Sequence, residues 1–241
     1  MQEEVIHYQV DGKTFKGLLV YENNAEARPG VIVAHAYKGQ DHFAQEKARE
    51  LARLGYTAFA ADYYGEGKTV ATAEEATQLM QPLFIDRALL RKRIVGAFEA
   101  LKQQKQVTPE AIGAIGFCFG GLTAIELLRS GADVKGVVSF HGLLGSQLGN
   151  MQAQLAPNHY MPSRAILILN GYEDPMVPET DISAIQKEFN DAKIDWQMNT
   201  YGHTKHAFMV PEANEGALKY NPLVCKRAWT AMELFFKEIL I

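Results

Sequence analysis

The stretch Gly116-Phe117-Cys118-Phe119-Gly120-Gly121 joins an apolar run, Ala111–Phe117, to a second apolar segment with helical spacing, Gly121–Arg129. The first run has the length and composition of a strand that is buried on both faces, and the second is predicted as a helix. A sharp turn from strand to helix needs glycines, because they let the two elements approach each other closely. The central residue, Cys118, would stand at a helix N-terminus, where backbone N–H groups and the helix dipole favour an anionic sulfur. The stretch therefore predicts a strand–turn–helix unit with a reactive cysteine at its tip.

Short apolar runs of the same kind recur on both sides of this unit, at Gly30–His35, Thr57–Ala61, Lys135–Phe140, Ala165–Asn170 and Asp195–Thr200. Segments with helical spacing separate them or close the chain, at Phe43–Leu54, Ala73–Met80, Phe84–Gln104, Ile182–Ala192 and Val224–Leu240. Two alternating segments, Glu3–Val10 and Thr14–Tyr21, flank a turn at Asp11-Gly12 and predict an antiparallel hairpin. The alternation predicts an α/β fold with a mostly parallel twisted sheet, an antiparallel N-terminal hairpin and helices on both faces.

Composition limits the classes of protein to which the chain can belong. Of its 241 residues, 47% are hydrophobic and 22% charged, which is ample for a buried sheet and untypical of a disordered protein. A formal net charge of −4 argues against binding to nucleic acid. No linker, repeat or low-complexity stretch divides the chain, and the loop Gly145–Ser163 is too short for a domain. We therefore expect a single domain over residues 1–241.

The chain also lacks the signals of export, membrane insertion and metal binding. Its N-terminus has no apolar core segment, and no apolar run approaches the length of a membrane-spanning helix. Only two cysteines occur, without CxxC spacing, so we expect a reduced, cytoplasmic protein. Four histidines lie far apart without ligand spacing, and no metal site is predicted from His35, His42, His141 and His159.

A cysteine nucleophile needs a base and an acid that orients the base, in the chain order nucleophile, acid, histidine. Asp174 follows the strand Ala165–Asn170 in the turn Gly171-Tyr172-Glu173-Asp174-Pro175, which is the expected place for the acid. Glu173 is the competing carboxylate, and Asp174 has the alternative role of stabilising the turn before Pro175.

The base is expected in the segment Gly202-His203-Thr204-Lys205-His206-Ala207-Phe208, after the last strand. We prefer His206, because the sequence His-Ala-Phe is the usual context of a hydrolase base, and we keep His203 as the alternative. The oxyanion hole should use the backbone N–H of Phe119, directly after the nucleophile, and that of Tyr37, in the loop after the third strand.

These residues resemble the dienelactone hydrolase family, whose elbow carries cysteine where most α/β-hydrolases carry serine. The resemblance covers nearly the whole chain and extends through Ala60–Gly67, Ser139–Gly142, the Asp174 turn and His206-Ala207-Phe208. It implies an α/β-hydrolase fold without a large lid, no cofactor, and a carboxylic-ester hydrolase of the carboxymethylenebutenolidase type. Substrate contacts are then expected from residues near the carboxyl ends of strands, namely Ala36, Tyr63, Tyr64, His141 and Phe208.

The chain departs from the family pattern at two positions. Family members commonly have a glutamate after the third-strand histidine that contacts the resting thiol, and Ala36 stands at this position. Val210 stands where dienelactone hydrolases have an arginine that helps to hold the substrate carboxylate. We therefore expect neutral esters or lactones to compete well with dienelactone, unless Arg87 or Arg91 supplies a cation.

The function predicted from the sequence is hydrolysis of a small ester or lactone through an acyl-cysteine intermediate, by a monomer or homodimer. One alternative is an inactive α/β-hydrolase that binds small molecules or senses thiol oxidation at Cys118. A second alternative is a thioesterase or peptide hydrolase on the same fold. Neither nucleic acid nor a membrane is an expected partner.

Overall fold

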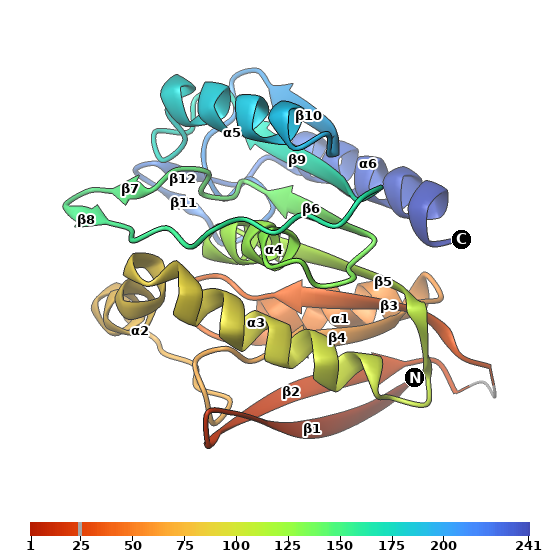
Figure 1. The fold of residues 1–241 in the computed structure, drawn as a ribbon. Coiled ribbons are helices and arrows are strands. Elements are labelled where there is room, and N and C mark those ends of the chain that lie inside the picture. The colour runs from red at the N-terminus through yellow and green to blue at the C-terminus, as the bar shows by residue number, and fades with distance from the viewer. Residues whose placement is uncertain (24–25) are drawn as a thin grey trace.

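The computed structural model describes residues 1–23 and 26–241 (Figure 1). Its main strands are β1 (Gln2–Val10), β2 (Lys13–Tyr21), β3 (Arg28–Ala34), β4 (Thr57–Ala61), β5 (Val107–Phe117), β6 (Gly136–Phe140), β9 (Ala165–Gly171) and β10 (Asp195–Tyr201). Its helices are α1 (His42–Arg53), α2 (Ala73–Ile85), α3 (Arg87–Lys102), α4 (Phe119–Arg129), α5 (Glu179–Asp191) and α6 (Pro222–Leu240).

The eight strands named above form one sheet, in the order β1-β2-β4-β3-β5-β6-β9-β10. The hairpin β1–β2 is antiparallel and adds to β4 in antiparallel fashion, while β4, β3, β5, β6, β9 and β10 are parallel. The mostly parallel sheet with an antiparallel N-terminal hairpin is thus confirmed. Because β3, β5, β6, β9 and β10 all run in one direction, the loops after them meet at one edge of the sheet.

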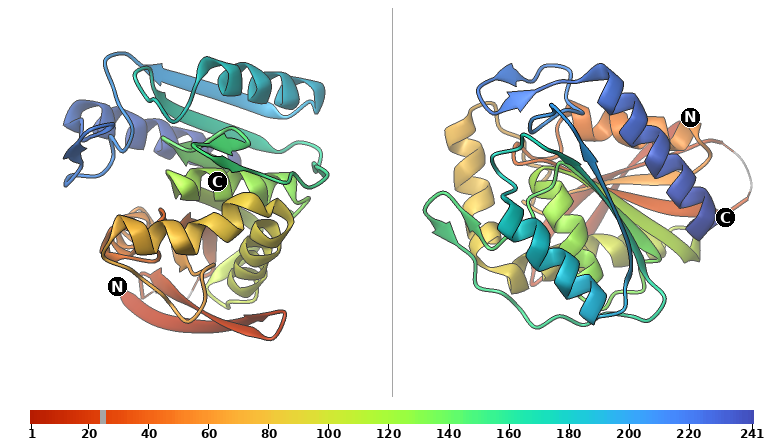
Figure 2. Two further views of the ribbon diagram at one scale, coloured as in Figure 1. Left: turned by 90° about the vertical axis from the view of Figure 1, so that its left-hand side faces the viewer. Right: turned by 90° about the horizontal axis from the view of Figure 1, so that it is seen from above.

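Helices cover both faces of the sheet, as its apolar strands require (Figure 2). On one face α1 packs against β2, β3 and β4, while α6 packs against β5, β6 and β9. On the other face lie α3, α4 and α5, and α2 packs on α3. Each face has its own buried apolar cluster, and the central strand residues Ile32, Ile115 and Val138 are fully buried.

The boundary between α2 and α3 differs from the prediction, which placed a break between Met80 and Phe84. The structure keeps Pro82 inside α2 and places the break at Asp86, whose backbone is extended. Backbone hydrogen bonds join Gln154 N–H to Ile85 and Arg87 N–H to Gln154, at 2.6 and 3.2 Å. Asp86 then accepts the Leu89 N–H at 2.9 Å and caps α3. The long-range pairing with Gln154 decides where α2 ends.

Two short hairpins were not predicted. One, β7 (Gln147–Leu148) with β8 (Met151–Gln152), lies within the loop Gly145–Ser163. The other, β11 (Asn214–Glu215) with β12 (Leu218–Lys219), lies between β10 and α6. Strands of two residues are too short to show alternation in a sequence. Among helices built from the described residues, none has both the length and the apolar composition to cross a bilayer.

Candidate active site

Cys118 occupies the turn between β5 and α4 and has a strained backbone, with φ 56° and ψ −117°. The glycines around it permit contacts that any side chain would block. A Cβ on Gly116 would lie 1.9 Å from the Gly120 carbonyl oxygen, and one on Gly120 would lie 2.1 Å from the Ala34 oxygen. The Cys118 N–H donates to the Phe140 carbonyl at 3.1 Å, which fixes the turn against β6. The turn therefore holds Cys118 at the edge of the sheet where the strand ends meet.

Asp174 and His206 come from the loops after β9 and β10 and meet at this edge. Nδ1 of His206 lies 2.6 Å from Oδ2 of Asp174, and both side chains are buried. The other oxygen of Asp174 accepts the Met176 N–H at 2.9 Å, which fixes the carboxylate in its turn. The Nδ1 contact orients the imidazole so that Nε2 is left available for proton transfer.

The electrostatics of the site favour the charged form of His206. Burial lowers the pKa of this imidazole, but the negative charge of Cys118 and the hydrogen bond and charge of Asp174 outweigh burial and raise the pKa to about 10. Nε2 of His206 has no hydrogen-bond partner within range among the described residues. In enzymes without bound substrate, the hydrogen bond between a base and its nucleophile is often absent or poorly aligned.

The competing pair, Glu173 and His203, lies at the surface. The His203 side chain is 99% exposed, and its Nδ1 lies 3.2 Å from Oε1 of Glu173. These two residues contact each other, and neither lines the cavity that contains Cys118 and His206. Burial is the feature that separates Asp174 and His206 from their neighbours in sequence.

The loop His35–Tyr37 is held by hydrogen bonds to its carbonyl groups. The hydroxyl of Tyr63 donates to the His35 oxygen, and that of Tyr64 donates to the Tyr37 oxygen at 2.8 Å. The Ala36 oxygen lies 2.6 Å from Nδ1 of His35. Because N–H and C=O point in opposite directions across a trans peptide, the Tyr37 N–H points away from the buried His35 ring. Neither this N–H nor that of Phe119 has a protein acceptor among the described residues.

Asp62 fixes the turn that carries the two tyrosines. Its carboxylate is fully buried and accepts the backbone N–H groups of Tyr64, Gly65 and Gly67 at 2.8 to 2.9 Å, and that of Lys16 at 3.0 Å. Sequence reasoning assigned no such role to Asp62. The signal available was its place before Tyr-Tyr-Gly-Glu-Gly, since aspartate often accepts backbone N–H groups of the turn that follows it.

A cavity of about 790 Å³ opens over Cys118, a typical size for a small-molecule site. Five predicted site residues line it, namely Ala36, Tyr37, Cys118, His141 and His206. Three predicted substrate contacts, Tyr63, Tyr64 and Phe208, do not line it and are buried. The hydroxyls of Tyr63 and Tyr64 are hydrogen-bonded to the His35–Tyr37 loop, so these two side chains support the wall of the cavity.

The lining of the cavity carries charges that sequence reasoning missed. Its acidic residues come from α1 with its N-cap and from the β11 region, and they are Asp41, Glu46, Glu50, Glu212 and Glu215. The basic residues are Lys38 and Lys47, and Lys47 is paired with Glu50 at 2.9 Å. Val210 lines the same cavity. The lining is therefore acidic on balance, and no arginine belongs to it within the described residues.

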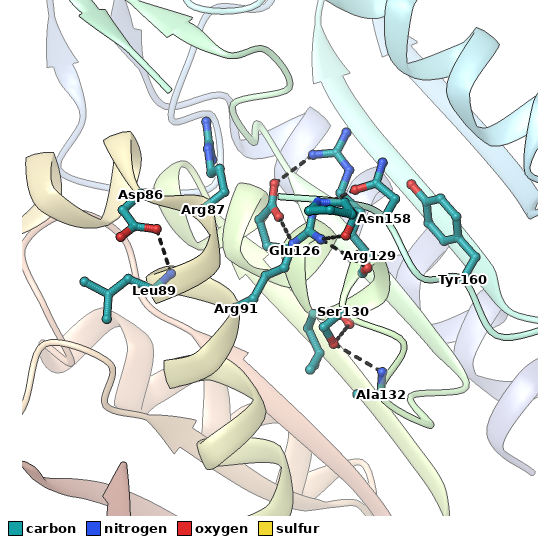
Figure 3. A network of polar contacts seen from close by, with 12 residues as sticks. Asp86, Arg87, Leu89, Arg91, Glu126, Arg129, Ser130, Ala132, Asn158 and Tyr160 are labelled. Carbon is teal, nitrogen blue, oxygen red and sulfur yellow. Dashed lines mark hydrogen bonds and ion pairs between the residues drawn. The ribbon is translucent and has the colours of Figure 1, made fainter. Parts of the chain in front are cut away.

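Arg87 and Arg91 do not reach this cavity. Arg91 pairs with the buried Glu126 of α4 at 2.5 Å (Figure 3). Arg87 is fully buried, packs over the Phe84 ring and donates to the Gly145 carbonyl at 3.1 Å. Burial lowers the pKa of Arg87 to about 10. Both arginines that the sequence offered as a cation for the substrate are therefore engaged within the protein beside α4.

Comparison with known proteins places this geometry in a family. The crystal structure of P91, a dienelactone hydrolase-like promiscuous phosphotriesterase from metagenomic libraries, has a TM-score of 0.89 and 32% identity, and the match covers 100% of this chain and 99% of that chain. The structure named m3DLH has a TM-score of 0.89 and 35% identity over the same shares. A Bradyrhizobium protein named "Probable 2-oxo-3-(5-oxofuran-2-ylidene)propanoate lactonase" is 26% identical over 87% of this chain and 83% of its own length. The model of the dienelactone hydrolase family matches residues 15–240, so this chain belongs to that family of hydrolases.

Proposed function

We propose that the chain hydrolyses a small, uncharged ester or lactone, with Cys118 as nucleophile, His206 as base and Asp174 as the acid that orients the base. The observation that carries this proposal is the buried contact of 2.6 Å between His206 and Asp174, at the same cavity as the strained Cys118. A binding or redox-sensing protein would not require this arrangement. Family membership and a relative named as a lactonase also favour a hydrolase.

In the proposed reaction, the Cys118 sulfur attacks the carbonyl carbon, and its proton is held by His206. The backbone N–H groups of Tyr37 and Phe119 donate to the developing oxyanion, each stabilising the transition state by about 3 kcal/mol. The alcohol leaves with the proton from His206, and an acyl-thioester remains. His206 then takes a proton from water, which attacks the thioester and releases the acid and the Cys118 thiol.

The charges around the cavity support an uncharged substrate. Carboxylates outnumber lysines along the lining, and Val210 cannot bind an anion. A substrate that carries a carboxylate would meet repulsion from the acidic residues and would lack an arginine partner. A reduced, cytoplasmic location is part of the proposal and is supported by the two free cysteines, Cys118 and Cys225.

The acyl-cysteine is tested with a p-nitrophenyl ester of a short acid. We expect a burst of p-nitrophenol close to one equivalent when enzyme and excess ester are mixed rapidly, and acylated Cys118 in the mass spectrum of quenched protein. Cys118→Ala should give neither signal. Turnover by Cys118→Ala at the wild-type rate would refute the proposal.

Phosphotriester hydrolysis is a second candidate function. The relative P91 is named as a promiscuous phosphotriesterase, and a phosphotriester is uncharged, as the acidic lining favours. Turnover of paraoxon that Cys118→Ala lacks would support this activity. Absence of turnover in wild-type protein that hydrolyses esters would exclude it.

A further inference from the structure

His141 lies directly after β6 and has no role in the mechanism described above. Its side chain is fully buried, and neither ring nitrogen has a hydrogen-bond partner among the described residues. It lines the cavity together with Cys118 and His206. A buried polar group without a protein partner is rare in folded proteins and points to a ligand or a reacting molecule.

The backbone holds His141 in this position against local strain. Its φ of 38° is unusual for a residue with a side chain. The His141 N–H donates to the Leu169 carbonyl at 2.8 Å, and a Cβ on the next residue, Gly142, would lie 2.1 Å from Oγ of Ser139. Contacts with β6 and β9 therefore fix the backbone at His141 beside the cavity.

The imidazole of His141 is neutral. Burial, followed by the positive charge of His206, holds its pKa well below the ordinary value. A neutral imidazole has one nitrogen that accepts a hydrogen bond and one that donates. His141 therefore offers an acceptor beside the charged form of His206.

The rings of His141 and His206 are in direct edge-to-face contact. The ring centroids of His141 and His206 lie 5.0 Å apart, edge to face. Two hydrogen bonds of about 2.8 Å to one water span up to about 5.6 Å between the bonded nitrogens. A water that bonds to a nitrogen of each ring would therefore lie at one side of the pair, in the cavity that both rings line with Cys118.

His35 shows that burial alone does not produce this arrangement. It is also a buried histidine, with its pKa lowered by burial to about 4. Its Nδ1 is engaged with the Ala36 carbonyl, and its Nε2 has no partner among the described residues. Its ring stacks on that of Tyr63, with the centroids 3.7 Å apart, and it does not line the cavity. His35 is a packing residue, whereas His141 faces the reacting groups.

We propose that His141 binds the water that hydrolyses the acyl-Cys118 thioester, an inference that rests on the acyl-cysteine mechanism proposed above. One O–H of this water donates to His141, and the other donates to His206, which takes that proton. The water oxygen forms a bond to the acyl carbon, the carbon–sulfur bond breaks, and the sulfur leaves with its electron pair. The proton on His206 then passes to the Cys118 sulfur, and the free acid is released.

The test separates acylation from deacylation in His141→Phe, which replaces imidazole by an apolar ring where Phe117 and Phe208 already pack. With a p-nitrophenyl ester in a stopped-flow instrument, we expect the burst rate to stay within a factor of about three of wild type. The steady-state rate should fall by about tenfold to a hundredfold. Acyl-Cys118 should accumulate in the mass spectrum.

Two further variants distinguish water binding from packing. His141→Asn and His141→Gln each restore a hydrogen-bond acceptor, and at least one of them should recover part of the deacylation rate. His159→Phe, at an exposed histidine, is the control and should behave as wild type. Because His141→Phe removes two buried nitrogens without partners, it should unfold at or above the wild-type temperature.

The possible outcomes separate this inference from the proposed function. If acyl-Cys118 forms but His141→Phe slows both steps equally, or slows neither, the role of His141 is wrong and the mechanism stands. If wild type hydrolyses the ester and neither protein forms acyl-Cys118, the acyl-cysteine mechanism is wrong, and this inference is overturned with it.

Discussion

Two buried polar regions adjoin α4 and differ in how their polar atoms are paired. Along the body of the helix, Glu126 accepts from Arg91 at 2.5 Å and from Arg129 at 2.9 Å. Arg129 also binds Glu188 of α5 at 2.6 Å, so this network connects α3, α4 and α5 (Figure 3). At the N-terminal end of the same helix, Nε2 of His206 and both nitrogens of His141 have no partner among the described residues.

We interpret this difference as a division between groups that maintain the fold and groups that we propose to act on substrate. A buried charge whose hydrogen bonds are all made within the protein has no capacity left for a ligand. A buried group whose bonds are not made within the protein is costly to the fold, and substrate or water can complete its bonds. The Glu126 network should therefore govern stability, and the Cys118 region should govern activity.

The largest effect is expected in the catalytic region. Cys118→Ala and His206→Ala should each lower ester hydrolysis by about 10³-fold or more, and the double variant should lose little further activity because the residues act as one unit. Initial rates with a p-nitrophenyl ester, at a temperature where each variant is folded, test this. Their matched controls are Glu173→Gln and His203→Ala, which should keep wild-type rates. A greater loss in either control than in Asp174→Asn or His206→Ala would overturn the assignment.

The second effect should appear in stability. Glu126→Gln removes the carboxylate paired with Arg91 and leaves Arg129 with Glu188 alone, so the free energy of unfolding should fall by about 3–5 kcal/mol. Urea unfolding measures this loss, while kcat of the folded enzyme should stay near the wild-type value. Asp191→Asn, which removes the exposed Lys187–Asp191 pair of α5, is the control and should change stability little. A loss of kcat in Glu126→Gln comparable to that of Cys118→Ala would erase the contrast between the two regions.

A smaller effect is expected from a charge placed beside the sulfur. Ala36 lines the cavity with Cys118, and a carboxylate at this position would disfavour the thiolate. Ala36→Glu should slow alkylation of Cys118 by iodoacetamide at neutral pH by about tenfold. Ala36→Gln has the same size without the charge and should react nearly as fast as wild type. Equal slowing in both variants would show that bulk, and not charge, controls access to the sulfur.

The smallest effect concerns substrate charge. Val210→Arg should raise kcat/KM for an ester that carries a carboxylate by about fivefold, relative to a neutral ester of similar size. The increase is small because the new cation is solvated at the rim of the cavity. Val210→Met is the control for size and should leave this ratio unchanged. A wild-type preference for the anionic ester would contradict the proposal that the acidic lining disfavours a substrate that carries a carboxylate.

The sequence by itself determined the strand–turn–helix unit around Cys118 and the alternation of strands and helices that gives a mostly parallel sheet. These features depend on neighbours in the chain. Only glycine fits at Gly116 and Gly120, and runs such as Ala165–Asn170 are apolar because both faces of the strand are buried. The sequence also indicated the residues proposed as acid and base, Asp174 and His206, because each follows a strand that ends at the same edge of the sheet.

The sequence favoured Asp174 over Glu173 and His206 over His203 from their context, and only the tertiary structure shows that the favoured member of each pair is buried while its competitor is exposed. Only the tertiary structure likewise shows that Tyr63 and Tyr64 donate to the His35–Tyr37 loop and that Arg91 pairs with Glu126. The acidic lining is assembled from α1 and the β11 region, which lie more than a hundred residues apart in the chain. Contacts between such distant segments leave no local pattern, because they depend on how the elements pack and not on the spacing of residues within any one of them.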